Sequence, residues 1–511
     1  MTKIVKNNFS RRQVGRQKII GFARHRTAIG ALGLIALGAL SLSPAQAQDV
    51  AELRAQLKAL EAKVAALEKS QSSGGSSDAL REKLEKLPNI TLDSKGINFS
   101  SPGIRTTRTE VGPGGIPIET TQVTDEGAFK LKIGGLLQPQ ARYFLGESGN
   151  STSTFLARRA RLNLEGTAYK NFDFKLQTDL QTTGSVPISG NMSATSVTTT
   201  VQDAYAGAKA YDWLQLRVGK MKSPLGIERW QSAKDRWFTD LITTTYIVPN
   251  RQIGAMLWGN VGDGLAEYYA GIFNGTPDGS SSNLSSSGQN EKDLQARLAL
   301  TPFAKANIPA LKKLTAGAGI SYAPEINALG TYADANQQVF FDWNSQAKNN
   351  LAGLRQTRFV PNVQYFWGPF GLYGEAAWST FQLKPASGLP RSLTNSAWQI
   401  ASSYVVTGED NSFRAISPRR KFSPSTGGWG ALQLAGRVGQ LTIDPDAFTT
   451  SLASNTSSAE ESLTYGGAVN WILNDNVKFT LGYDYTSFVR GAAQGDRRNS
   501  SAVTSQLQFA F

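Results

Sequence analysis

Apolar and polar side chains alternate along most of the chain from residue 127 onward. In the first such run, Phe129 and Leu131 share one parity, whereas Lys130 and Lys132 share the other. Alternation of this kind predicts a β-strand with one apolar and one polar face. The runs are about 10 residues long or somewhat longer, as in membrane barrels, and clusters of Gly, Ser, Asn, Asp and Pro separate them. They predict antiparallel strands joined by turns and loops.

Sixteen runs of this type can be counted in the sequence. They cover residues 128–145, 154–169, 172–182, 199–210, 213–221, 252–260, 264–274, 291–301, 313–322, 352–366, 369–381, 396–407, 428–441, 461–473, 476–488 and 501–511. A barrel of about sixteen strands leaves a water-filled lumen, whereas about eight strands would be packed shut by side chains. The predicted fold class is therefore an all-β transmembrane barrel of about 16 antiparallel strands over residues 127–511, preceded by a short N-terminal coiled-coil helix.

A soluble β-sandwich or propeller is the alternative for a chain with so many strands. The polar parity here is rich in Arg, Lys, Gln and Asn, as a wet lumen requires, and no propeller-type repeat is found. Six tryptophans lie at or near the ends of the runs, as in the aromatic girdles of membrane barrels. They are Trp213, Trp258, Trp367, Trp378, Trp398 and Trp471. Each one alone fits a core equally well, and only their repetition favours the barrel.

Residues 1–47 have the pattern of an export signal. Eight Lys and Arg side chains precede and flank an apolar run at 28–42, and Ala45-Gln46-Ala47 follows as a small-residue cleavage site. The apolar run is shorter than the roughly 20 residues that a spanning helix needs. We predict a cleaved signal peptide, and together with the predicted barrel it places the protein in the outer membrane of a Gram-negative bacterium.

Residues 48–70 carry an apolar seam with alternating steps of three and four. It consists of Val50, Leu53, Leu57, Leu60, Val64 and Leu67. Such a seam predicts a coiled coil of about three heptads; the alternative is a single amphipathic helix packed on its own domain. Self-association is favoured because a Ser/Gly linker follows at 72–77. Residues 71–126 are predicted to contain this linker and short strands.

The composition limits the kinds of catalytic and metal-binding site that the protein can contain. The formal charge is +14, but removal of residues 1–47 leaves 45 basic and 39 acidic residues. Of these, 35 basic and 27 acidic residues lie in 127–511. There is no Cys, and the only His, His25, lies in the predicted signal. Cysteine nucleophiles, Ser-His-Asp triads and His/Cys zinc sites are therefore excluded. An acidic pair or a Ser-Lys arrangement is not singled out by any spacing, so we predict no enzyme, catalytic residue, cofactor or metal.

A positive excess on the polar parity predicts a pore for anions, because fixed cations offset the dehydration that an anion undergoes in a narrow pore. Parity assigns to the lumen Lys130, Lys132, Arg142, Arg159, Arg161, Lys175, Arg217, Arg297, Arg358, Arg437 and Lys478. Acidic residues occur in the same regions, among them Glu165, Asp179 and Asp240. Partial pairing would leave a general-diffusion porin with weak ion preference.

Several short motifs, in order, resemble those of a known family. They are 129–135 (FKLKIGG), 158–166 (RRARLNLEG), 203–205 (DAY), 216–226 (LRVGKMKSPLG), 250–254 (NRQIG), 434–437 (LAGR) and 470–474 (NWILN). Residues 127–511 are thus similar to the phosphate- and polyphosphate-selective porins, porins O and P.

The resemblance implies a trimeric, sixteen-stranded barrel whose third extracellular loop, about 223–250 here, folds inward. That loop would add Lys222, Arg229, Lys234, Arg236 and Arg251 to the constriction. The predicted function is passive diffusion of small anions, with phosphate or polyphosphate as the specific case. A structural tether of the outer membrane is a third, weaker alternative. The predicted partners are two further copies of the chain, outer-membrane lipid and small anions, but no nucleic acid.

Overall fold

The computed structural model describes residues 89–93, 96–101, 104–111, 117–124, 128–145, 152–182, 197–282, 290–326, 328–349, 355–383 and 391–511. All of them belong to one compact unit, Lys86–Phe511. The predicted signal peptide at 1–47 and the predicted coiled coil at 48–70 lie outside the described residues. No described helix has the length and apolar character needed to cross a membrane.

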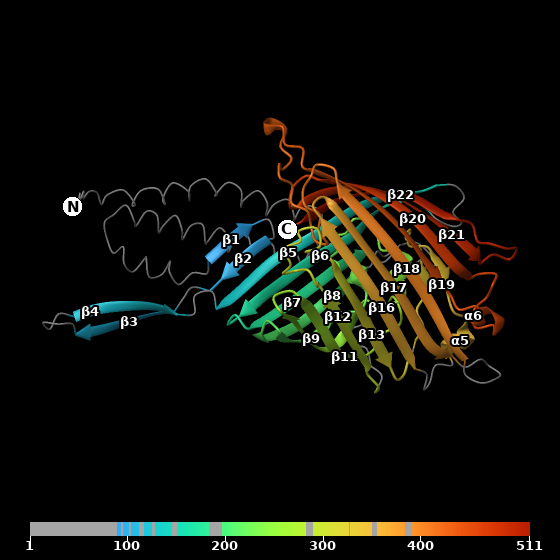
Figure 1. Cartoon of the computed structure of the whole chain (residues 1–511), viewed down its shortest axis with the longest axis horizontal. Helices are drawn as coiled ribbons and strands as arrows, with labels where there is room; N and C mark the ends of the chain where they lie inside the picture. Colours follow the sequence, from blue (N-terminus) through green and yellow to red (C-terminus); the bar gives the residue numbers. More distant parts are fainter. Residues whose placement is uncertain are drawn as a thin grey trace, which may run out of the picture. The chain divides into compact units, whose positions relative to one another are not determined.

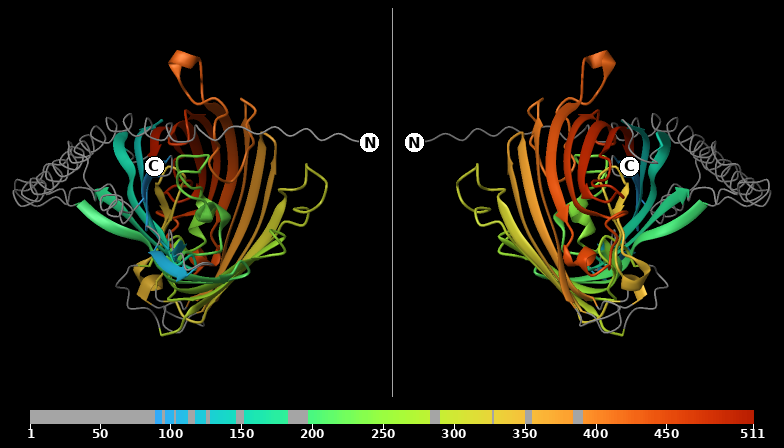
Figure 2. Two further views of the ribbon diagram at one scale, coloured as in Figure 1. Left: turned by 90° about the vertical axis from the view of Figure 1, so that its left-hand side faces the viewer. Right: turned by 90° about the vertical axis from the view of Figure 1, so that its right-hand side faces the viewer.

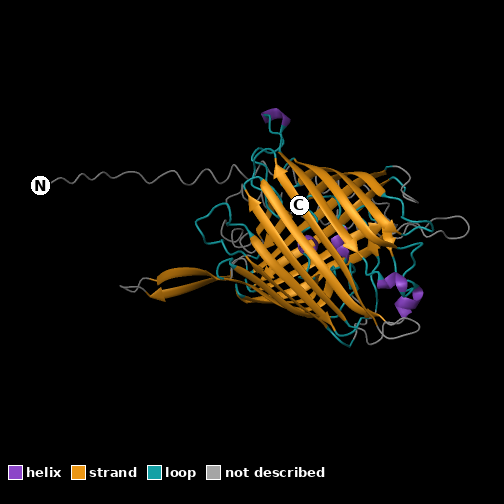
Figure 3. Cartoon of the chain, turned by 45° about the vertical axis from the view of Figure 1, so that its right-hand side comes forward, coloured by secondary structure: helices purple, strands orange, loops and turns teal. Residues whose placement is uncertain are grey.

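Sixteen antiparallel strands form a closed barrel (Figures 1 and 3). They are β5 (Phe129–Phe144), β6 (Thr154–Ala168), β7 (Phe172–Thr182), β8 (Val197–Tyr211), β9 (Leu214–Lys222), β10 (Arg251–Val261), β11 (Ala266–Phe273), β12 (Asp293–Leu300), β13 (Thr315–Ala323), β16 (Gln356–Trp367), β17 (Phe370–Leu383), β18 (Arg391–Val405), β19 (Ala431–Thr442), β20 (Ala459–Ile472), β21 (Val477–Arg490) and β22 (Ser500–Ala510). Each strand pairs with the next, and β22 pairs with β5 to close the ring. The predicted barrel is confirmed, and each predicted run overlaps one of these strands.

Short strands precede the barrel. β1 (Asn89–Asp93) and β2 (Gly96–Ser100) form a hairpin, and β2 continues the edge of β5 by pairing with residues 130–133. Further along the same edge, β5 pairs with β22 instead. β3 (Ile104–Val111) and β4 (Pro117–Thr124) form a hairpin of their own.

The two faces of the barrel wall differ as the alternation predicts. In β12, Asp293, Gln295 and Arg297 are buried toward the lumen, whereas Leu294 and Leu298 are exposed on the outside. An outward apolar band is what a barrel presents to lipid.

The predicted tryptophan girdle is only partly right. Trp367, Trp378 and Trp398 are exposed on the outer face. Trp258, in contrast, faces inward, because it shares the parity of the buried Met256 and stacks on Tyr269, its register partner in β11. Its position near a strand end gave no information about which face it occupies.

The connections differ between the two ends of the barrel. At one end they are mostly two to four residues long, except for 301–314 and 406–430, and the 406–430 connection contains η2 (Pro424–Thr426). At the other end they are longer and contain α4 (Ile227–Trp230), η1 (Thr243–Tyr246), β14 (Tyr332–Ala333), β15 (Val339–Phe341), α5 (Ser345–Asn349) and α6 (Asp446–Thr449). Short turns mark the periplasmic end of such barrels and long loops the extracellular end.

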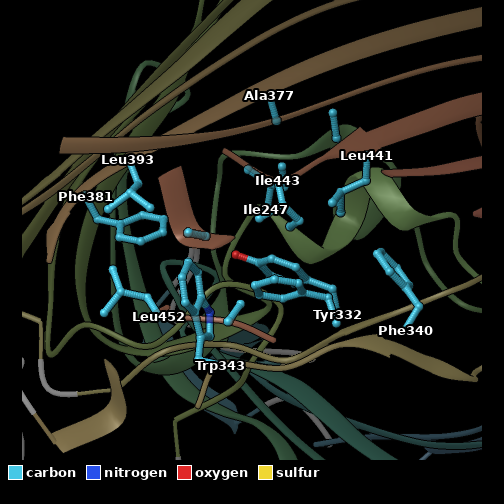
Figure 4. Packing of buried hydrophobic residues seen from close by; sticks show 14 of the residues in the cluster. Ile247, Tyr332, Phe340, Trp343, Ala377, Phe381, Leu393, Leu441, Ile443 and Leu452 are labelled. Carbon is cyan, nitrogen blue, oxygen red and sulfur yellow. The ribbon is translucent and has the colours of Figure 1, made fainter. Parts of the chain in front are cut away.

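A hydrophobic core lies inside the barrel, at the end with the long loops (Figure 4). Its members come from several connections and from the wall, and they include Ile247, Tyr332, Phe340, Trp343, Ala377, Phe381, Leu393, Leu441, Ile443 and Leu452. This core packs residues of three of these connections, among them Ile247, Tyr332 and Leu452, against one another and against the wall.

Candidate anion-binding site in the lumen

The segment 223–250, between β9 and β10, lies within the ring of strands (green in Figure 2). The wall holds its backbone with hydrogen bonds. Asn470 on β20 donates from Nδ2 to the carbonyl of Trp237 at 2.8 Å, and Lys478 on β21 donates from Nζ to the carbonyl of Arg236 at 2.7 Å. These bonds attach the segment to the inner face of the barrel wall.

The carboxylate of Asp240 in this segment binds three arginines of the neighbouring strands β5 and β6. Its carboxylate accepts from Arg142 Nη2 at 2.9 Å, from Arg158 Nε at 2.8 Å and from Arg159 Nη2 at 3.3 Å. Burial alone would raise the pKa of Asp240, but the three positive charges outweigh it and hold the pKa far below its usual range. The carboxylate therefore stays ionised, and three of the positive charges on this wall are directed at it.

Arg437 on β19 forms a second anchor. Its Nη1 donates to the backbone carbonyl of Asp240 at 2.8 Å, and its Nη2 forms an ion pair with Asp484 at 2.7 Å. Glu228 lies 3.9 Å from Nη1, and the guanidinium stacks over Phe238 at 4.3 Å. Arg437 thus binds the segment through charge, a hydrogen bond and a ring.

Other predicted site arginines also hold loops. Arg229 donates from Nε to the carbonyl of Thr245 at 2.9 Å and from Nη2 to that of Gly279 at 3.0 Å. Arg358 donates from Nε to Asp278 at 2.7 Å. Both guanidinium groups are buried, so they stabilise the loops.

Arg297 is buried as well and Arg236 is half-buried, and the Nε atom of each has no hydrogen-bond partner among the described residues. Burial lowers the pKa of Arg236 to about 9. An arginine in this state still carries its charge at neutral pH.

A cavity of about 500 Å³ remains between the segment 223–250 and strands β5 to β9. Seven basic side chains line it, and they are Lys132, Arg161, Lys175, Arg217, Lys222, Lys234 and Arg251. Three acidic side chains accompany them, namely Glu165, Asp203 and Asp475. The cavity therefore carries an excess of positive charge.

Some of these cations are paired. Lys132 and Lys175 share Glu165, at 3.1 and 3.8 Å. Arg161 Nε lies 2.8 Å from Asp179, and Arg251 Nε lies 2.8 Å from Asp203. These pairs fix the positions of the side chains and reduce the field that they contribute.

The remaining cations of the cavity, Lys222, Lys234 and Arg217, have fewer carboxylates close to them. Lys222 donates from Nζ to the backbone carbonyls of Trp230 and Gln231. Within the described part of the chain, no carboxylate oxygen lies within 4.0 Å of Nζ of Lys222 or Lys234. Arg217 lies 3.7 Å from Asp173, at the edge of ion-pair distance.

A second cavity of about 540 Å³ adjoins the first toward β2. The two share Lys132, Glu165, Lys175 and Tyr205 as lining residues, and Lys130 lines the second one. Basic side chains thus continue from one cavity into the next.

The structure divides the predicted site residues into two groups. Lys130, Lys132, Arg161, Lys175, Arg217, Lys222, Lys234 and Arg251 line the two cavities. Arg142, Arg159, Arg229, Arg297, Arg358, Arg437 and Lys478 are buried against loops or the wall, whereas Arg236 is half-buried and lines neither cavity. Parity alone does not separate these groups.

Arg158 and the role of Asp240 were missed by the sequence reasoning. A β-bulge between Gln138 and Pro139 makes the register pass over Arg158, so that Arg158 and Arg159 both reach Asp240. Proline inside a strand is a common sign of a bulge, and Pro139 was therefore the available signal.

A closed sixteen-stranded barrel with a cation-lined lumen defines an outer-membrane porin, a channel through which small anions diffuse. The family model "Phosphate-selective porin O and P" matches residues 138–511. The chain belongs to this family, as the resemblance predicted.

Individual relatives are distant in sequence. Porin O of Pseudomonas aeruginosa is 21% identical over 425 residues, which cover 78% of this chain and 91% of the relative. Among solved structures, the outer-membrane channel DcaP of Acinetobacter baumannii is 13% identical with a TM-score of 0.46, over 75% of this chain and 98% of that one. The anion-selective porin from Comamonas acidovorans is 12% identical with a TM-score of 0.45, over 75% of this chain and 100% of that one.

Proposed function

We propose that the cation-lined cavity between segment 223–250 and strands β5 to β9 is the selectivity region of the channel, and that phosphate is among the anions it favours. The observation that carries the proposal is the excess of basic over acidic side chains in one cavity. Phosphate carries more than one negative charge near neutral pH and accepts several hydrogen bonds, so it gains more from clustered Lys and Arg than chloride does.

The paired and less paired cations would act differently. Those that share carboxylates, such as Lys132 and Arg251, position the lining. Lys222, Lys234 and Arg217 face the cavity with fewer compensating charges. They are the side chains on which the preference for anions chiefly depends.

The test is the zero-current potential of the purified protein in a planar bilayer under a KCl gradient, repeated with added phosphate. We expect a potential of anion-selective sign and a reduction of chloride current by phosphate. Anion selectivity without this reduction would leave an anion porin that does not select phosphate. A cation-selective sign would refute the proposal.

The variant Arg217→Glu tests the location of the selectivity region. We expect a marked shift of the zero-current potential toward cation selectivity, because the substitution makes the charge of the cavity lining more negative by two units. Lys305→Glu is the matched control, because Lys305 is exposed on the 301–314 connection and outside both cavities. Equal shifts in the two variants would mean that the cavity does not determine selectivity.

We further propose that the signal peptide directs export of the chain and is then cleaved after Ala47. We also propose that the chain forms a homotrimer reinforced by the coiled coil at 48–70. The spacing of the apolar seam supports self-association. N-terminal sequencing of the protein from outer membranes should begin at Gln48. The mass of the native complex, with and without residues 48–70, tests the trimer and the contribution of the coil.

A further inference from the structure

The cavity also has an apolar wall. Leu136, Met221, Trp230 and Ile416 line it together with the basic side chains. Met221 and Ile416 are almost fully buried, and Ile416 comes from the long connection 406–430. The wall is therefore assembled from the barrel, the inward segment and a third part of the chain.

An aromatic cluster backs this wall and holds one of its cations. The Arg217 guanidinium lies 4.2 Å from the ring centre of Tyr205 and 5.2 Å from that of Trp258. Trp258 stacks parallel on Tyr269 at 6.1 Å. The rings of Tyr205 and Trp258 thus hold the guanidinium of Arg217, which remains part of the cavity lining.

Trp230 extends the same cluster into the inward segment. Its ring meets Tyr269 in a T-shaped contact at 5.1 Å. The backbone carbonyl of Trp230 accepts a hydrogen bond from Lys222 Nζ at 3.0 Å. Trp230 thus contributes its ring to the cavity lining and binds the ammonium group of Lys222 through its backbone carbonyl.

Inorganic phosphate and chloride can use only the cations, because a hydrated ion gains nothing from an apolar surface. A solute with an aromatic ring beside its charge can use both, since its ring leaves water against the wall while its anionic group meets Lys or Arg. A volume of about 500 Å³ is within the range of roughly 300–1,000 Å³ typical of small-molecule sites.

We infer that the cavity prefers organic anions whose carboxylate or phosphate is attached to an aromatic ring, over anions of equal charge without one. The inference rests on the proposed function, because it assigns the substrate class of the same cation-lined cavity. It goes beyond that function in giving the aromatic wall a part in selection.

The test compares benzoate with acetate, which carry the same charge and the same carboxylate. Chloride current through the purified full-length protein is measured in planar bilayers while either salt is added at pH 7. We expect benzoate to halve the current at a concentration about tenfold lower than acetate, since aromatic contacts of this kind discriminate by roughly that factor.

The variant Trp230→Leu keeps the backbone carbonyl that accepts from Lys222 and removes the ring. We expect the concentrations of benzoate and of acetate that halve the chloride current to become nearly equal in this variant, so that their ratio approaches one. Trp429→Leu is the matched control, because Trp429 is 73% exposed and lines neither cavity. The ratio should be unchanged in this variant.

Equal block of the wild-type channel by benzoate and acetate would overturn the inference while leaving the anion channel intact. An unchanged ratio in Trp230→Leu would overturn the role of the wall. Cation selectivity of the wild type in KCl alone would instead refute the proposed function, so the two failures are separable.

Discussion

The anchoring of segment 223–250 by Asp240 leads to a quantitative prediction for the variant Asp240→Asn. The substitution removes the negative charge that Arg142, Arg158 and Arg159 share and leaves their guanidinium groups close together. Asp240 is 2% exposed, so water can replace little of the lost interaction. Breaking a buried ion pair from one side costs about 3–5 kcal/mol, and we expect a loss of that size in the free energy of unfolding.

The assay is urea unfolding of the detergent-solubilised protein, followed by tryptophan fluorescence. With a slope of about 3 kcal/mol per molar urea, the midpoint should fall by about 1 M or more. The control is Asp263→Asn, because Asp263 forms an exposed ion pair with Lys305, and such pairs contribute little. The variant and its control have the same change in charge and in shape.

The pH dependence gives a second readout of the same anchor. The folded-state pKa of Asp240 lies below that of an unfolded carboxyl, so its contribution to stability is complete above the unfolded pKa, about 3.9. It is lost only as the pH falls through the lower folded value. If Asp240→Asn matched the wild type in urea midpoint at pH 7, the anchoring role of this carboxylate would be wrong.

Three further predictions concern the loops and the wall. Burial raises the pKa of Asp334 to about 6, so wild-type stability should fall by about 3 kcal/mol as the pH rises from about 4 to 6, and Asp334→Asn should abolish that fall in urea titrations. Phe341→Ala should cost about 3–5 kcal/mol of unfolding free energy, measured in urea, whereas Val339→Ala beside it should cost little because Val339 is half exposed. Gly219→Ala should destabilise the barrel by about 1–3 kcal/mol, because φ is +126° and a Cβ would clash with backbone atoms. The control is Gly436→Ala, because a Cβ there would meet open space. Loss of the heat-resistant folded band on gels would report the destabilisation.

The sequence alone could not predict that aromatic and basic side chains line the same cavity. Trp230 lies within the segment 223–250, whereas Trp258 lies in the strand that follows it. The alternation of apolar and polar residues along a strand gives no information about Trp230, because that residue is outside a strand. Their shared contact with Tyr269 arises only when β10 and β11 pair and the segment folds inward. Long-range packing of this kind leaves no local pattern.

The roles of the basic residues were likewise decided by tertiary contacts. Arg142 and Arg217 occupy equivalent positions by parity, yet Arg142 is bound to Asp240 and Arg217 lines the cavity. The difference comes from where one carboxylate lies after the chain has folded. The bulge at Pro139 adds Arg158 to the same cluster, since one extra residue changes which side chains can reach inward.

The sequence by itself determined the barrel, its sixteen strands and the apolar outer face, because a strand has a period of two and the lipid and the lumen impose opposite polarity on its two faces. It also determined that basic residues exceed acidic ones in the barrel region. Only the tertiary structure decided which cations are held in buried ion pairs and which line the cavities, because those contacts join residues as far apart as Arg437 and Asp240. Charge is a property of composition, but the field in a pore depends on how the charges are paired in space.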